Sequence, residues 1–147
     1  MIIWLRFVAF AVLGICIAIA DFRTHRIPNA LLLVLIGLLA GIDLVFLGTK
    51  AIFFNFLAGL GAFGLFFVVF RLKGGLGFGD VKYAGVIGYF LGPWQVLSGL
   101  LCAVLLCLLY WCVGRLIFHW GKEKRLPFGP WLCCGAIAAA IIHRGLL

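Results

Sequence analysis

Few residues of this chain could do chemistry, and the most informative of them is Asp80. It ends a glycine-rich run, Gly75-Leu76-Gly77-Phe78-Gly79-Asp80-Val81-Lys82, inside a chain that is otherwise almost entirely apolar. A charged side chain at membrane depth costs about 2.5–3.5 kcal/mol on insertion scales, so an aspartate in such a chain indicates a functional site. The acidic residues are only four: Asp21, Asp43, Asp80 and Glu123.

A second carboxylate beside Asp80 would complete a reactive pair, and Asp21 is the candidate. Two carboxylates at the ends of different helices can meet across a bundle, and such a pair shares one proton near neutral pH. The ionised group can deprotonate a water molecule while its protonated partner polarises a carbonyl group. The chemistry predicted is peptide-bond hydrolysis without a covalent intermediate. Gly77 and Gly79, which lack side chains, would let a substrate backbone approach Asp80 closely.

The elements that position these residues must lie in a membrane. The 147 residues are 67% hydrophobic and 11% charged, with a mean hydropathy of +1.30, which excludes a water-soluble globular domain of ordinary composition. At 16.1 kDa there is room for several spans and none for a separate soluble domain. We therefore expect residues 1–147 to form a single all-α, polytopic transmembrane domain. The net charge of +8 does not indicate nucleic-acid binding, because the basic residues occur in short clusters between apolar runs.

Apolar runs predict six transmembrane helices. Four of these helices correspond to the runs over residues 2–20, 29–47, 51–70 and 95–118, and a further helix ends near Arg144. The remaining run, residues 81–91, would rise only ~16 Å, about half the hydrocarbon thickness. The fourth span must therefore extend into the glycine-rich turn, which places Gly79 and Asp80 in a cavity or cleft below the interface. Residues 21–28 are expected to form a polar turn, with Pro28 opening the next helix.

The first apolar run has an alternative interpretation as a cleaved signal peptide ending at Ala18-Ile19-Ala20. Against it, the first residues carry no positive region, Arg6 interrupts the run early, and the rest of the chain is itself apolar. We therefore expect residues 2–20 to be a retained helix.

Basic residues divide unequally between the two sets of loops, which predicts the orientation. The first, third and fifth loops carry nine of them, and the opposite side carries three: Arg6, Lys50 and Arg144. This excess predicts that the odd-numbered loops are cytoplasmic and that both termini lie outside. Asp21 and Asp80 then share the cytoplasmic side, and Asp43 is expected at the opposite interface. Glu123 is expected to pair with its basic neighbours.

Three motifs, in order along the chain, carry a resemblance to a known family. They are Asp21 followed by Ile27-Pro28-Asn29, Gly77-Phe78-Gly79-Asp80-Val81-Lys82 running into Ala84-Gly85, and Pro127-Phe128-Gly129-Pro130. Together they resemble the type IV prepilin peptidases, which are six-span membrane aspartyl proteases. The resemblance implies that Asp21 and Asp80 are the catalytic pair.

The resemblance also implies a substrate and a place. Family members remove a short basic leader from type IV prepilin-like or pseudopilin precursors, cutting after a glycine and before an apolar helix, at the cytoplasmic face of a bacterial inner membrane. The expected partners are therefore such precursors and membrane lipid. Longer members add a cysteine-rich domain and methylate the new N-terminus. This chain resembles the short, peptidase-only members, so methyltransferase activity, a metal and any other cofactor are not expected.

Other residues near the motifs have more than one interpretation. Lys82 could act on Asp80, touch a substrate carboxylate, or serve only as a positive-inside anchor. Pro28 and Asn29 are expected to shape and cap the second helix, and Pro127 to shape the loop before the sixth. None of the cysteines forms a C-x-x-C pair, and all are interpreted as small core residues: Cys16, Cys102, Cys107, Cys112, Cys133 and Cys134.

Three other functions stay open on the sequence. A presenilin-type or signal-peptide-peptidase-type protease would share the G-x-G-D motif, but Asp21 here follows Ala20 and not a tyrosine. A small ion-coupled carrier would use its aspartates to bind an ion, and internal symmetry would favour it. An assembly factor without catalysis would keep its function after Asp21→Asn.

Overall fold

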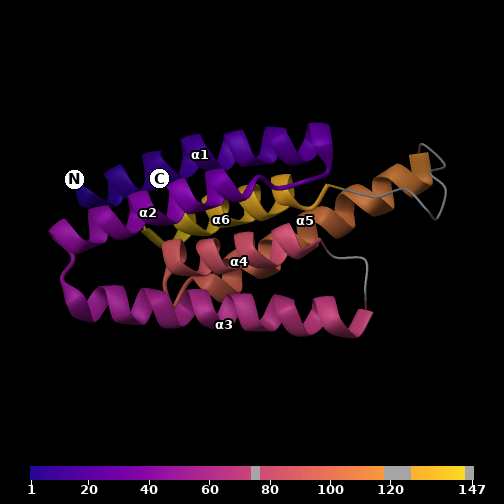
Figure 1. Cartoon of the computed structure of the whole chain (residues 1–147). Helices are drawn as coiled ribbons and strands as arrows, with labels where there is room; N and C mark the ends of the chain where they lie inside the picture. The colour runs from indigo at the N-terminus through magenta and orange to yellow at the C-terminus, as the bar shows by residue number, and fades with distance from the viewer. Residues whose placement is uncertain (74–76, 118–126, 145–147) are drawn as a thin grey trace.

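Six α-helices form the chain in a computed structural model that describes residues 1–73, 77–117 and 127–144 (Figure 1). The expected pairing of Glu123 lies outside the described residues. The helices run in the order α1 (Ile2–Thr24), α2 (Asn29–Phe46), α3 (Thr49–Lys73), α4 (Phe78–Leu91), α5 (Val96–Ile117) and α6 (Gly129–Arg144).

The helix lengths fit a membrane protein. α1, α2, α3 and α5 are each long and apolar enough to cross a bilayer. α4 and α6 are shorter, with 14 and 16 residues, which correspond to about 21 and 24 Å. Ten of the 14 residues of α4 are buried, so the other helices enclose this short element. The prediction of an all-α, polytopic membrane fold with six helices is confirmed, including the extension of the fourth helix into the glycine-rich turn.

α4 lies at the centre of the arrangement, between α3 on one side and the layer of α1, α2 and α6 on the other (Figure 1). Helix association in membranes relies on small residues that let backbones approach closely. Gly88 shows this, because a Cβ atom there would lie 2.7 Å from the Ala58 carbonyl oxygen and 2.9 Å from the Cα of Gly59. α3 and α4 therefore pack backbone against backbone at this point, which fixes α4 against α3.

Aromatic side chains connect α4 to α1. The ring of Phe10 stacks on Phe90 with 4.1 Å between centroids and lies 6.4 Å from the ring of Tyr83. All three residues are almost completely buried. The buried residues of α1 recur every three or four positions, from Arg6 through Phe10 to Asp21, so one face of this helix carries both the packing residues and the aspartate.

α1 is longer than predicted. Residues 21–24 were expected to begin a polar turn, and that expectation is wrong, because they continue the helix. The helix continues to Thr24 and ends at His25, which has φ 50° and donates its backbone N–H to the Asp21 carbonyl oxygen at 2.8 Å. Asp21 lies on the buried face and finds a polar partner there, so the helix does not need to end before it. The aspartate is thus held by a helix and not by a loop.

The expectation that Asp43 lies at an interface is also wrong. Its side chain is 0% exposed and forms an ion pair with Arg6, with 3.0 Å between Nε and Oδ1. Asn55 donates to the other carboxylate oxygen at 3.3 Å. Arg6 also donates to the carbonyl oxygens of Tyr89 and Phe90, at 3.3 and 3.1 Å. Buried charges are tolerated when they are paired and hydrogen-bonded, and this Arg6–Asp43 pair joins four helices.

The cysteines are core residues in only one clear case. Cys133 is buried, Cys16 and Cys134 are exposed on the outer surface, and the other three are half-buried. Interpreting all six as core residues was therefore wrong. Lipid tails are as apolar as a protein core, so a small apolar side chain can face them without penalty.

Candidate active site

Asp21 enters the site from the last turns of α1. Its carboxylate is 5% exposed, and its Oδ2 accepts the backbone N–H of Gly129, the first residue of α6, at 2.9 Å. A Cβ atom on Gly129 would lie 2.8 Å from the same oxygen. Residue 129 must therefore be a glycine for the carboxylate to sit this close to the helix N-terminus, where free N–H groups favour an anion.

Asp80 enters the site from the first turn of α4. Its Oδ2 accepts the backbone N–H of Gly77 at 3.1 Å, so the carboxylate caps its own helix. The residue is 9% exposed, and a Cβ atom on Gly77 would lie 3.0 Å from Oδ2. A carboxylate in the first turn of a helix is favoured by the free N–H groups there, so Asp80 also stabilises the start of α4.

The two aspartates lie at the same end of the bundle. Asp21 is in the last turn of α1 and Asp80 is in the first turn of α4, 59 positions further along the chain. Each has one oxygen held by a backbone N–H group. Among the described residues, neither Oδ1 atom accepts a hydrogen bond from the protein, which leaves one oxygen of each carboxyl group for a water molecule or a substrate.

The segment between α1 and α2 packs against the glycine-rich turn. A Cβ atom on Gly79 would lie 3.0 Å from the Cβ of Ile27, so this glycine lets the two segments touch. Pro28 then precedes α2 as its N-cap residue, in extended conformation. Within the part of the chain that the structure describes, no side-chain hydrogen bond caps this helix, so the expectation that Asn29 caps it is wrong. The Asn29 side chain instead bonds to Lys82. The structure thus gives Gly79 a packing function in addition to the access for substrate that was expected.

Lys82 and Asn29 connect α4 to α2 beside the site. The Lys82 ammonium group donates to Asn29 Oδ1 at 3.0 Å and lies 4.8 Å from the centre of the Phe78 ring. Pro127 lies two residues before Gly129 at the start of α6. Of the predicted site-shaping residues, Gly77 contacts Asp80 directly, and Lys82 bonds to Asn29 at the start of α2.

Gly129 is the functional residue that the sequence analysis missed. It stands in the Pro127-Phe128-Gly129-Pro130 motif, but only the prolines were singled out there. A glycine between two prolines before an apolar run was the available signal. Nothing in the sequence indicates that the Gly129 N–H group donates to Asp21, because the two residues are 108 positions apart.

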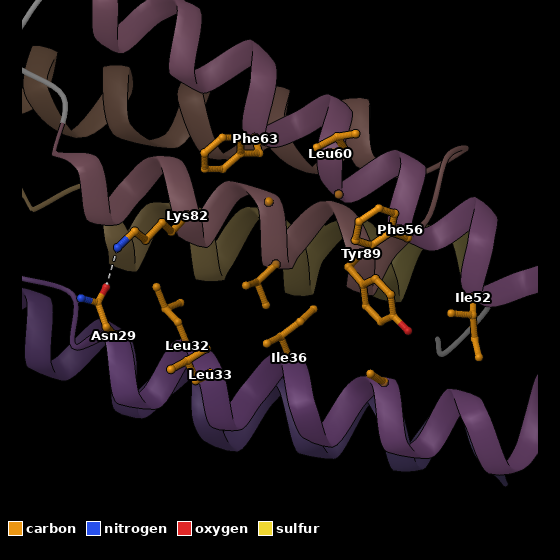
Figure 2. Close-up of a pocket in the computed structure, with 14 residues that line it drawn as sticks. Asn29, Leu32, Leu33, Ile36, Ile52, Phe56, Leu60, Phe63, Lys82 and Tyr89 are labelled. Atoms are coloured by element: carbon orange, nitrogen blue, oxygen red, sulfur yellow. Dashed lines mark hydrogen bonds between the residues drawn. The ribbon is translucent and has the colours of Figure 1, made fainter.

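An apolar groove starts beside the site (Figure 2). Its volume is about 790 Å³, and α2, α3 and α4 line it. Asn29 and Lys82 stand at one end, while Ile52 and Tyr89 stand at the other. The hollow has the size of many ligand-binding pockets, about 300–1,000 Å³.

The arrangement can support acid–base chemistry at a membrane surface. Two nearly buried carboxylates lie at the same end of the bundle, are oriented by backbone donors, and keep an oxygen each for other partners. Such a pair can share a proton and act as base and acid in one reaction. The N–H groups that orient the carboxylates come from helix starts, which limits their movement.

Comparison with known proteins gives a consistent result. The family model described as the type IV leader peptidase family matches residues 8–112. A prepilin leader peptidase/N-methyltransferase of Bacillus subtilis is 32% identical over 134 residues, covering 90% of this chain and 53% of that protein. A protein of the same name from Pectobacterium carotovorum is 31% identical over 133 residues, covering 86% and 47%. The leader peptidase HopD of Salmonella typhimurium is 39% identical over 84 residues, covering 52% of each chain.

The relatives are longer than this chain. It spans about half the length of each of the three proteins. No solved structure matches the chain significantly. The matched region contains both Asp21 and Asp80.

Proposed function

The chain belongs to the type IV leader peptidase family, and we propose that it is an aspartyl endopeptidase that removes the basic leader from prepilin-like or pseudopilin precursors. The observation that carries this proposal is that Asp21 and Asp80 lie at the same end of the bundle, each with one carboxylate oxygen held by a backbone N–H group. The names of the relatives, which include prepilin leader peptidases, support the class of substrate.

In the proposed reaction the two aspartates share one proton. The ionised carboxylate removes a proton from water as the water oxygen attacks the carbonyl carbon of the scissile bond, and the protonated carboxyl group gives its proton to the carbonyl oxygen. A neutral diol results. The protonated aspartate then gives its proton to the nitrogen as the C–N bond breaks, and a hydroxyl group of the diol gives its proton to the ionised aspartate. The pair is singly protonated again, and no covalent intermediate forms.

The site is proposed to face the cytoplasm, in a bacterial inner membrane with both termini outside. The distribution of basic residues supports this orientation, because Arg23, Arg26 and Arg71 all lie at the end of the bundle that carries the aspartates. The named relatives are bacterial proteins.

The neighbouring residues are proposed to position the pair and not to react. Gly79 and Pro28 set the contact between the glycine-rich turn and the segment before α2. Lys82 and Asn29 join α4 to α2. Gly77 orients Asp80, and Pro127 shapes the approach to α6. We propose that this chain performs the peptidase step alone, without methyl transfer, which the mass of the cleaved product would decide.

Co-expression with a tagged prepilin tests the proposed function. The wild-type chain should shorten the precursor and create a new N-terminus directly after the leader glycine, while Asp21→Asn and Asp80→Asn should not. Thr24→Val, an exposed change in the same helical turn as Asp21, should cleave normally. Each variant is checked for membrane insertion and for a single peak in detergent gel filtration.

The outcomes separate the alternatives. If the wild-type chain cuts none of several prepilins, the substrate class is wrong, and the carrier and assembly-factor functions become the stronger ones. If folded Asp21→Asn or Asp80→Asn variants still cut, the proposed mechanism is wrong although the substrate is right.

A further inference from the structure

The apolar groove between α2 and α3 has a defined direction. Its floor is α4, the helix that carries Asp80, and its walls are α2 and α3 (Figure 2). Along α2 it extends from Asn29 to Ala40, eleven residues or about 16 Å. The groove therefore leads from the candidate active site about halfway across the hydrocarbon layer.

The polar and apolar parts of the groove are separated. Asn29 and Lys82 form its end beside the site, and their hydrogen bond is visible in Figure 2. The walls beyond them are formed by large apolar side chains, including Leu33, Phe56 and Leu60, which are exposed to the surroundings. In a membrane such side chains face lipid, so the groove opens sideways into the bilayer.

One end of the groove lies near the start of α4, although neither Asp21 nor Asp80 is among its lining residues. Lys82 follows Asp80 by two residues, and Asn29 follows Ile27, whose side chain touches Gly79. A chain leaving the groove at this end would meet the first turn of α4. Gly59 and Gly85 line the hollow where α3 and α4 meet, and the lack of side chains on these two residues lets the two helices pack closely at the floor of the groove.

We propose that this groove binds the first turns of the precursor's apolar helix, which enters from the lipid between α2 and α3 and places the scissile bond at Asp80. This inference rests on the proposed function. The precursor helix matches the groove from end to end. Its apolar residues would lie along the apolar walls, and the polar junction between leader and helix would lie at the polar end formed by Asn29 and Lys82. A helix in this position remains in the membrane while its leader reaches the cytoplasmic side.

A second hollow is the main rival for the same occupant. It has a volume of about 460 Å³ and lies between α1 and α6, with Ile19, Phe22 and Cys134 among its lining residues. Neither aspartate lines it, and it lies on the helix that carries Asp21 and not on the helix that carries Asp80. The groove over α4 is favoured because it is larger, has walls from three helices and ends in the Asn29–Lys82 pair.

Photo-crosslinking locates the helix directly. p-Benzoylphenylalanine is placed at Leu33 and Leu60 in the groove, and at their neighbours Val34 and Leu57, which are similarly exposed but do not line it. A further site is Ile19 in the rival hollow. The wild-type active site is kept, and the precursor is made uncleavable by replacing its leader glycine.

The proposal expects precursor adducts at Leu33 and Leu60 that are several times stronger than those at Val34 and Leu57. Adducts concentrated at Ile19 would overturn it in favour of the rival hollow. Equal adducts at all positions would overturn it in favour of no defined binding. Adducts to phospholipid at Leu33 and Leu60 that added precursor does not reduce would show that lipid is the occupant.

Kinetics give an independent test. Leu33→Trp and Leu60→Trp should fill part of the groove and raise KM for the membrane-inserted precursor about tenfold, the lower end of the range for a poorly fitting apolar group. Val34→Trp and Leu57→Trp, on the same helices, should leave KM unchanged. If the wild-type chain cleaves the precursor and none of the four variants changes KM, the groove proposal fails and the proposed function stands. If the wild-type chain does not cleave, the proposed function itself fails.

Discussion

At the scale of single residues, backbone N–H groups organise the site as much as side chains do. Asp80 is oriented by Gly77 in its own helix start, and Asp21 by Gly129 from another helix. The capping and catalytic interpretations of Asp80 are therefore compatible, since the cap uses Oδ2 and leaves Oδ1. The sequence motifs predicted both aspartates but not these donors, because a backbone donor has no residue type that identifies it.

Gly129→Ala should strongly reduce cleavage in a protein that stays folded. The new Cβ atom would lie 2.8 Å from Asp21 Oδ2, so the carboxylate must move away from its donor. Misplacing a catalytic group by about 1 Å can cost about 100-fold in rate, and we expect a loss of kcat of that order. The measurement is steady-state cleavage of a purified precursor in detergent micelles.

The matched control is Gly64→Ala, a glycine of α3 with no atom within 4 Å of its added Cβ. It should keep full activity and gain slightly in stability, as alanine replaces glycine in a helix interior. Normal activity of Gly129→Ala would show that the Gly129 contact does not position Asp21.

At the scale of elements, α4 is fixed at both ends. Its N-terminal turn carries Asp80, and its last carbonyl groups accept hydrogen bonds from Arg6, which is itself paired with Asp43. α1 carries both Arg6 and Asp21 on its buried face. The Arg6–Asp43 pair therefore ties together, at the far end of the bundle, the two helices that present the aspartates.

Breaking this pair should destabilise the protein severely. Arg6→Met leaves the Asp43 carboxylate buried without its partner, and removing one member of a buried pair costs about 3–5 kcal/mol. Thermal unfolding in detergent, followed by circular dichroism, would show a large fall in Tm.

The double variant Arg6→Met/Asp43→Leu should recover most of that loss, because two apolar side chains of similar size replace the charges. A Tm of the double variant as low as that of the single variant would contradict a role for the charge pair. It would indicate that the contacts of Arg6 with the α4 carbonyl oxygens dominate.

Hydropathy predicted the elements well and their ends less well. Each apolar run became a helix, since a membrane requires internal hydrogen bonding of the backbone. The end of α1 was misplaced because the polar residue Asp21 was expected to end the span, whereas it faces the bundle and finds Gly129. The Arg6–Asp43 pair was missed because each charge, taken alone, suits an interface, and a spacing of 37 residues carries no signal.

At the scale of the whole molecule, the bundle has two different ends. The aspartates and the starts of α4 and α6 lie at one end, and the start of α1 and the end of α6 lie at the other (Figure 1). The charge distribution predicts that the first of these ends is cytoplasmic. The sequence could predict that both termini lie at the end of the bundle opposite the aspartates, because an even number of crossings returns the chain to the side where it began.

Alkaline phosphatase fusions test the orientation. A fusion after Gly48, between α2 and α3, and a fusion at the C-terminus should both be active outside the cytoplasm, and a fusion after Arg26 should be inactive. Green fluorescent protein at the same positions provides the control, since it fluoresces when it folds in the cytoplasm. The reverse pattern would place the aspartates outside and exclude a cytoplasmic site.

The most direct test of the central claim is the cleavage rate of purified Asp21→Asn, Asp80→Asn and the double variant on one prepilin. When two groups act as a unit, the effects of their mutations do not add. Each single variant should therefore lose at least about 10²–10⁴-fold in kcat, and the double variant should lose no more than the worse single variant. Losses that multiply in the double variant, or a single folded variant with wild-type kcat, would show that the two aspartates do not act as a catalytic pair.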